Sequence, residues 1–179
     1  MSDKILNQFN KLEEELNLLF SNLKKIDNNF LNYKPEANKW SIIQIIHHLY
    51  KSEQLSIVYI KRKVRDKNNI KKSNLVSKIR GMILEWTLRL PTKLKAPANV
   101  ADVPDTAELK FYIDKWTKIR DDLLQIIKNT ERNLLMSNIF KHPAVGETNI
   151  IYALKFMQAH FEHHKKQIDK ILLSDNKFV

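Results

Sequence analysis

The chain has 179 residues and contains only two glycines and five prolines, too few for the turns of an all-β protein, so we predict an all-α fold in one domain spanning residues 1–179. The absence of cysteine excludes disulfides, thiolate metal sites and a cysteine nucleophile, so that any metal ion must be held by His, Asp or Glu. The formal charge of +11 would suit a nucleic-acid or membrane-surface partner.

Two long amphipathic helices are predicted in the first third of the chain. Apolar residues at helical spacing indicate the first helix from about residue 3 to residue 29. The second begins near Trp40, where Ser41 is a suitable N-cap, and continues to about Arg65.

A shorter helix is predicted over residues 74–90, and the stretch from Pro91 to Pro104 is interpreted as an ordered loop. The residues at 105–108 have the Asp-Thr-Ala-Glu sequence of a capping box, which predicts a third long helix reaching about residue 131. The last helix follows Gly146 and spans about 148–173. These elements predict a four-helix bundle with an extra short helix between its second and third helices.

The histidines offer a metal site between two of these helices. His160 and His164 are four residues apart, so they lie on one helix face about 40° apart and can reach one ion. They also continue the buried stripe of the last helix, where unpaired imidazoles are costly. A third histidine from the second helix would complete a three-histidine set with an open coordination position, which is typical of catalytic sites. Because His47 and His48 flank the apolar face of that helix at similar angles, periodicity does not choose between them.

Other polar residues have simpler interpretations. Glu53 and Glu162 lie close enough along the chain to be considered for proton transfer, but a salt bridge or a solvated carboxylate is the commoner role for each. His142 precedes a proline, and a surface or capping role is favoured over ligation. Residues 61–72 contain seven Lys or Arg, which makes nucleic-acid binding the main competing function. Basic residues also occur in every other predicted helix, so we expect no specific nucleic-acid partner.

Three motifs in order resemble the DinB/YfiT-like family of metal-dependent proteins. The first is the Trp-Ser start of the second helix leading to His48-Leu49, followed by Glu53. The second is the Lys-Ala-Pro sequence at 95–97, in the middle loop. The third is His142-Pro143-Ala144-Val145-Gly146 before the closing helix, in which His160, His164 and Gln167 form an HxxxHxxQ pattern. The resemblance covers essentially the whole chain.

The resemblance implies a four-helix bundle that carries a divalent ion, nickel or zinc, on three histidines. Carried over to this sequence, the metal ligands are His48, His160 and His164, and His47 and His163 match no ligand position. Gln44 stands where an acidic residue is common in the family. Family members of known activity include S-transferases that use low-molecular-weight thiols and a thiol-dependent isomerase, while others are described as damage-inducible or hydrolase-like.

We therefore expect a divalent-metal-dependent enzyme, a thiol-dependent S-transferase or a hydrolase, with no catalytic residue assigned beyond the ligands. A non-catalytic metal-binding or stress-response module is the alternative, and a basic nucleic-acid-binding protein is the third possibility. No signal peptide or membrane-spanning segment is recognised, so we expect a cytoplasmic protein without a membrane partner. The expected partners are a small-molecule substrate, such as a low-molecular-weight thiol, and a second copy of the chain in a homodimer.

Overall fold

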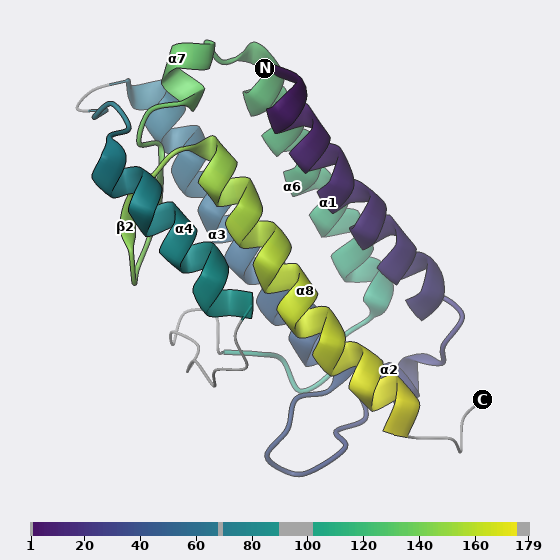
Figure 1. The fold of residues 1–179 in the computed structure, drawn as a ribbon. Coiled ribbons are helices and arrows are strands. Elements are labelled where there is room, and N and C mark those ends of the chain that lie inside the picture. The colour runs from purple at the N-terminus through teal and green to yellow at the C-terminus, as the bar shows by residue number, and fades with distance from the viewer. Residues whose placement is uncertain (1, 68–69, 90–101, 175–179) are drawn as a thin grey trace.

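The computed structural model describes residues 2–67, 70–89 and 102–174, and its four long helices pack side by side as a bundle (Figure 1). The bundle helices are α1 (Ser2–Leu23), α3 (Ile42–Asp66), α6 (Leu109–Asn129) and α8 (Ile150–Ser174). Both α1 and α3 contact α6 and α8, so each helix has two neighbours around a shared interior. The predicted all-α fold and four-helix bundle are confirmed.

The predicted extra helix is α4 (Leu75–Arg89), which lies on the outside of the bundle against α8 (Figure 1). Its inner face carries small residues, the buried Ser77 and Gly81. A Cβ atom at Gly81 would collide with the aromatic ring of Tyr152 on α8. Glycine therefore allows α4 to approach α8 closely at this point.

The start of α3 agrees with the predicted N-cap at Ser41. The Ser41 hydroxyl accepts a hydrogen bond from the Gln44 backbone N–H at 3.2 Å, and the Gln44 side chain accepts one from the Ser41 N–H at 3.1 Å. This is a complete capping box. The Gln44 amide also donates to the Pro104 carbonyl at 2.9 Å, a bond that a glutamate here would lack, so the departure from the family pattern has a structural role.

The first predicted helix was too long. α1 ends at Leu23, and a separate short helix, α2 (Asn28–Asn32), follows it. The Asp27 carboxylate accepts the backbone N–H of Asn29 at 2.8 Å, and this side-chain bond starts a new helix instead of continuing the old one.

The predicted capping box at 105–108 was also wrong. α6 begins at Leu109, and Glu108 makes no side-chain capping bond. Asn28 and Asn32 of α2 supply hydrogen-bond partners at the start of α6 instead. Asn32 bonds both the N–H and the carbonyl of Ala107, at 2.9 and 3.0 Å, and the Asn28 side chain accepts from Leu109 N at 3.4 Å. Tertiary contacts thus fix the start of this helix in place of a local cap.

A short helix and a hairpin connect α6 to α8. The helix is α7 (Arg132–Leu135), and the antiparallel strands are β1 (Phe140–His142) and β2 (Gly146–Thr148), with Phe140 opposite Thr148. The sequence analysis did not predict the hairpin. Gly146 has a φ of 83°, which other residues rarely adopt, so the turn depends on glycine here.

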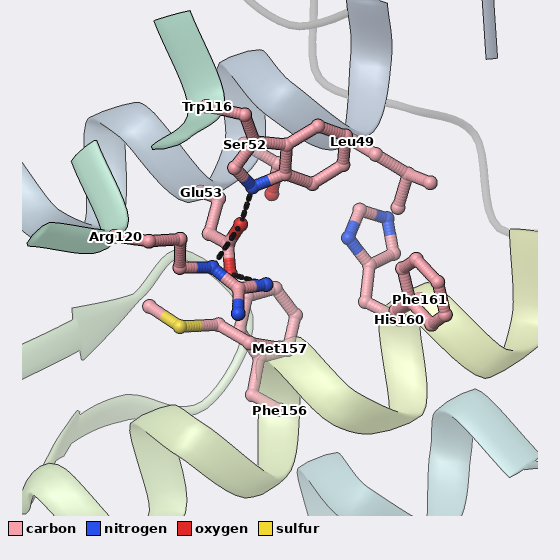
Figure 2. Close-up of a pocket in the computed structure, with 9 residues that line it drawn as sticks. All are labelled: Leu49, Ser52, Glu53, Trp116, Arg120, Phe156, Met157, His160 and Phe161. Atoms are coloured by element: carbon pink, nitrogen blue, oxygen red, sulfur yellow. Dashed lines mark hydrogen bonds and ion pairs between the residues drawn. The ribbon is translucent and has the colours of Figure 1, made fainter. Parts of the chain in front are cut away.

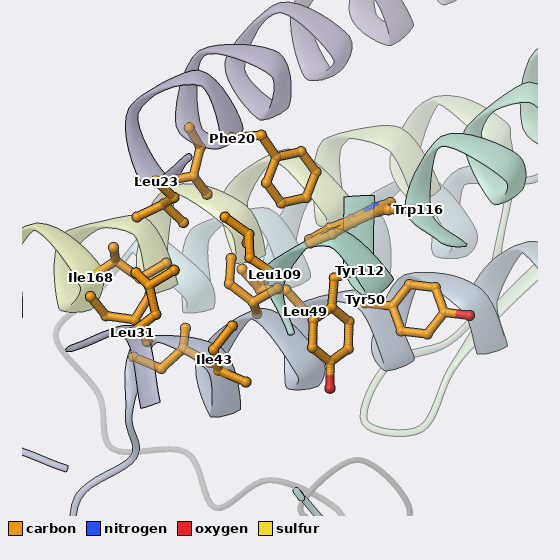
Figure 3. Packing of buried hydrophobic residues seen from close by; sticks show 14 of the residues in the cluster. Phe20, Leu23, Leu31, Ile43, Leu49, Tyr50, Leu109, Tyr112, Trp116 and Ile168 are labelled. Atoms are coloured by element: carbon orange, nitrogen blue, oxygen red, sulfur yellow. The ribbon is translucent and has the colours of Figure 1, made fainter. Parts of the chain in front are cut away.

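The bundle interior consists of two apolar clusters. One lies at the end of the bundle that carries α2, around residues such as Trp116, Tyr112 and Ile43 (Figure 3). The other packs the hairpin against α8 and includes Phe140 and Met157. Together they bury apolar faces of all four long helices, the arrangement that amphipathic helices require.

Some predictions fall on residues outside the described ranges. These are most of the Pro91–Pro104 loop, namely residues 91–101, and with it the Lys-Ala-Pro sequence at 95–97. Residues 102–108 are described and are not helical. Within the described residues, no helix is both long and apolar enough to cross a membrane.

Candidate metal centre

Two bundle helices that contact each other carry the candidate ligands. The capping box fixes the start of α3, and His48 lies two turns further along it, buried with 4% of its surface exposed. α8 carries His160 and His164 one turn apart. Because α3 and α8 pack together, the ring of His48 meets both rings of the pair, with centroid separations of 5.0 Å to His160 and 4.7 Å to His164.

The three rings direct nitrogen atoms toward one another. The Nε2 atoms of His48 and His160 are 3.1 Å apart, and one nitrogen from each of the three rings lies within 4.8 Å of the others. Nitrogen ligands about 2.0–2.1 Å from a tetrahedral ion are roughly 3.3 Å from one another. The closest pair already has nearly this spacing. Among the described residues, this triad is the group of His, Asp and Glu that could hold a metal ion.

The protonation of the triad suits a metal ligand. Burial, together with the neighbouring His48, lowers the pKa of His164 to about 3. Burial also holds the pKa of His160 well below its usual range, with His164 and His48 acting in the same direction. Both rings are therefore neutral near pH 7, the form in which an imidazole nitrogen has a lone pair for a metal.

Gln167 orients one of the ligands. Its side-chain oxygen lies 3.0 Å from His164 Nδ1, so a neutral His164 that donates from Nδ1 keeps the Nε2 lone pair for an ion. The amide nitrogen of Gln167 reaches His163 Nε2 at 3.3 Å. Gln167 thus links the ring of the candidate ligand to the neighbouring ring that the sequence analysis left without a role.

We predict that Gln167→Ala weakens metal binding by about 10- to 100-fold, because His164 loses the partner that fixes its tautomer and ring orientation. Competition of the purified protein with a chromogenic chelator measures the change in Kd. The matched control is Gln125→Ala, an exposed glutamine of α6 whose side chain bonds only to Asn129 among the described contacts. Equal affinity for the two variants would show that Gln167 does not orient the ligand.

Aromatic rings enclose the triad. Phe156 stacks on His160 with a centroid distance of 5.4 Å and an interplanar angle of 11°. Trp40 lies 5.1 Å from the His48 ring, so its role is to cover this ring at the start of α3. These contacts limit ring rotation and exclude water, which favours a fixed ligand geometry.

A second prediction concerns the metal-free protein in acid. The folded-state pKa values of His160 and His164 are lower than the unfolded value near 6.5, so the unfolded chain binds more protons below that pH. Stability should fall as the pH drops from about 6.5 toward 3, by up to about 1.4 kcal/mol per pH unit for His164, and His160 acts in the same direction. Urea unfolding at a series of pH values in the presence of a chelator tests this, and His164→Leu should show a shallower slope. A slope unaffected by that substitution would contradict the prediction.

His47 and His142 have other partners. His47 points toward α6, where its Nδ1 is 3.0 Å from the Tyr112 hydroxyl, and burial lowers its pKa. His142 ends β1, accepts the Ala144 N–H at 3.2 Å and has a pKa lowered by burial. The structure therefore places His48, and not His47, beside the α8 pair. That His48, His160 and His164 ligate an ion stays a prediction.

The two carboxylates considered for proton transfer are both engaged elsewhere. Glu53 is buried and forms an ion pair with Arg120, 2.7 Å from Oε1 to the guanidinium, and it also accepts the Trp116 indole N–H. Glu162 accepts the Gln158 amide at 2.9 Å and lies 3.8 Å from Lys11. For both residues the structural role expected from the sequence agrees with these contacts.

A small cavity separates the Glu53–Arg120 pair from His160 (Figure 2). Its volume is about 10 Å³, room for a single water molecule and not for an organic substrate. Met157 and Phe161 complete its apolar wall. The cavity therefore lies between His160 and the ion pair, and it is too small to bring a substrate to the triad from this side.

The sequence analysis missed three residues that shape this site. From the sequence, Phe156 was not considered, Trp40 was used only as part of the Trp-Ser start of the second helix, and Gln167 only as part of the HxxxHxxQ pattern. The helical period gives a signal for two of them. Phe156 is four residues before His160, and Gln167 is three residues after His164, so both share a helix face with the histidine pair. Trp40 precedes the helix and has no such signal.

Comparisons with known proteins agree with the fold and the motifs. The sequence profile of the DinB superfamily matches residues 8–168. The uncharacterized protein YuaE of Bacillus subtilis (strain 168) is similar, with 24% identity over 155 residues that cover 85% of this chain and 89% of YuaE. A crystal structure of TT2238, titled a four-helix bundle protein, aligns with a TM-score of 0.54 and 15% identity over 93% of this chain and 98% of that one, which supports the fold alone.

Proposed function

Because this chain belongs to the DinB superfamily, we propose that it is a divalent-metal-dependent enzyme whose ion, nickel or zinc, is held by His48, His160 and His164. The observation that carries the proposal is the meeting of three imidazoles whose nitrogens lie within 4.8 Å of one another. Burial keeps two of these rings neutral, and the described residues add no carboxylate to the group. The donor set fits a borderline cation such as Ni²⁺ or Zn²⁺ better than the oxygen-loving Mg²⁺ or Ca²⁺.

The reaction we propose is the transfer of a low-molecular-weight thiol to a small electrophilic substrate. When bound on three imidazoles with an open position, such an ion would hold a thiol as its thiolate or lower the pKa of a water molecule. Hydrolysis gains from a nearby carboxylate base, but Glu53 is committed to Arg120 and Glu162 to Gln158. A thiol that loses its proton on binding needs no such base, so we favour thiol transfer over hydrolysis.

The chain's own residues would prepare the site for this chemistry. Gln167 sets the tautomer of His164, while Phe156 and Trp40 hold the His160 and His48 rings and keep water from their faces. Reduced thiols are available in the cytoplasm, and we propose that the protein acts there. We also propose that it forms a homodimer. Light scattering of the purified protein checks the dimer.

Cobalt substitution tests the thiol step separately from turnover. We expect the Co²⁺-loaded protein to develop a near-ultraviolet thiolate-to-cobalt absorption when cysteine is added, and no change with S-methylcysteine, which has no thiol. His163→Ala, which alters the same helix next to the triad, should retain the band, and His164→Ala should lose it. If the loaded wild-type protein bound no thiol, thiol transfer would be ruled out, and a hydrolytic or non-catalytic metal-binding role would replace it.

A further inference from the structure

The outer face of α4 exposes large apolar side chains. Leu75, Val76, Ile79, Met82 and Ile83 have between 43% and 71% of their surface exposed. We call this set the α4 stripe. The opposite face, with Ser77 and Gly81, is the one that packs against α8. Over residues 75–83 the helix is therefore amphipathic in the reverse sense, with small residues toward the protein and large apolar residues toward solvent.

The α4 stripe is continuous and has cations at both edges. With about 100° between successive helical residues, its five members fall within an arc of about 120°. Lys78 and Arg80 each lie about 40° beyond one edge of that arc, and both are exposed. Lys71 and Lys72, also exposed, come just before the helix. An apolar stripe with basic borders is the pattern of a helix that lies in a membrane interface.

The charge of the chain is concentrated in the same region. Residues 61–100 contain twelve Lys or Arg but only two Asp or Glu, a net charge of +10 out of the total of +11. The other residues of the chain are almost neutral in sum. Basic residues do occur in every long helix, but over residues 1–60 and 101–179 taken together they exceed the acidic residues by only one. Coding bias toward lysine does not explain this local lack of acidic residues.

We propose that the α4 stripe docks on the surface of an anionic lipid bilayer. Its apolar side chains would enter the headgroup region while Lys78 and Arg80 meet the lipid phosphates. A second copy of this chain fits the stripe poorly, because it would bring two segments of charge +10 together. A partner helix would need a groove between two elements, whereas the stripe lies on one helix outside the bundle (Figure 1).

This surface contact needs no spanning helix, and it replaces the expectation of no membrane partner. It is independent of the proposed metal chemistry, because α4 carries none of the three histidines. A homodimer, if it forms, should use a surface other than the α4 stripe. Duplex DNA is a poorer partner for the α4 stripe, because its phosphates would attract the lysine and arginine side chains but leave the apolar side chains exposed to water.

Vesicle flotation tests the proposal with the full chain. In 100 mM salt, the protein should float with phosphatidylcholine vesicles that contain phosphatidylglycerol and stay behind with pure phosphatidylcholine. Leu75→Ser with Ile79→Ser should reduce the apparent affinity at least about tenfold, because two large apolar side chains leave the interface. Lys78→Glu should reduce it about tenfold or more, because it changes the local charge by two.

Matched controls make the result specific. Leu18→Ser replaces a leucine of α1 that is 59% exposed, and Lys118→Glu reverses an exposed lysine of α6; both should bind vesicles as the wild type does. Circular dichroism should show unchanged helix content in every variant, since each replaced side chain is exposed. The proposal is overturned if the wild type ignores anionic vesicles, or if the double serine variant binds them equally well. Conversion of a dimer into a monomer by that variant would also overturn it, because a second copy would then cover the stripe.

Discussion

Replacing His160 or His164 by alanine is expected to abolish metal retention while leaving the bundle folded. Each substitution removes one of three proposed ligands, and two imidazoles alone hold a divalent ion weakly. The helices should remain, because two apolar clusters fill the interior and alanine has the highest helix propensity. Metal content after dialysis, together with far-ultraviolet circular dichroism, measures both effects on one sample.

His163→Ala is the matched control, because it removes a neighbouring imidazole of α8 that is hydrogen-bonded to Gln167. This variant should retain the ion. If the metal-free wild type unfolded completely on chelation, the ion would be structural and the bundle's own packing insufficient. If His160→Ala and His164→Ala retained the ion as the control does, the assignment of the ligands would be wrong.

A loss of stability of about 3 kcal/mol or more is expected for Arg120→Met, because removal of one partner leaves a buried charge uncompensated. Arg120 and Glu53 are only 2% and 5% exposed, and the guanidinium also contacts Glu13 at 2.7 Å. In the Arg120→Met variant, Glu53 would still accept the hydrogen bond from the Trp116 indole, but it would lose its ion pair with the guanidinium. Urea unfolding with linear extrapolation measures the free energy of unfolding.

The paired variant Glu53→Met with Arg120→Met should recover most of that loss, since it removes both charges and leaves apolar side chains of similar size. Arg62→Met replaces an exposed arginine of α3 and should change stability by less than about 0.5 kcal/mol. An equal loss of unfolding free energy in the single and the paired variant would mean that the change of side-chain shape, and not the unpaired charge, destabilises the protein.

The sequence was sufficient to predict the bundle and, from spacing alone, two of the three candidate ligands. His160 and His164 lie on one helix, so their spacing alone puts them on one face. The N-cap at Ser41 is equally local, because its partner Gln44 is three residues away. The family resemblance then selected His48 as the third residue.

The choice between His47 and His48 could not be made from periodicity, and the reason is geometric. The two side chains leave α3 about 100° apart, one toward α6, where Tyr112 lies, and one toward α8. Which neighbour lies on which side depends on the handedness of the bundle. A single helix does not encode that arrangement.

The other missed features also depend on distant parts of the chain. The start of α6 is fixed by Asn28 and Asn32, which are about eighty residues away in sequence. The hairpin has strands of only three residues each, too short for an alternating pattern. The exposed α4 stripe has the period of an ordinary buried face, so the sequence alone does not reveal that it points to solvent.

Elemental analysis of the purified protein, prepared without a histidine tag, measures whether His48, His160 and His164 hold a metal ion. We predict about one nickel or zinc ion per chain, held by three nitrogen ligands at about 2.0–2.1 Å in X-ray absorption spectra of the zinc form. A chain that remains empty after incubation with an excess of either ion and dialysis would contradict it. So would an ion whose coordination is unchanged when His48 is replaced by alanine.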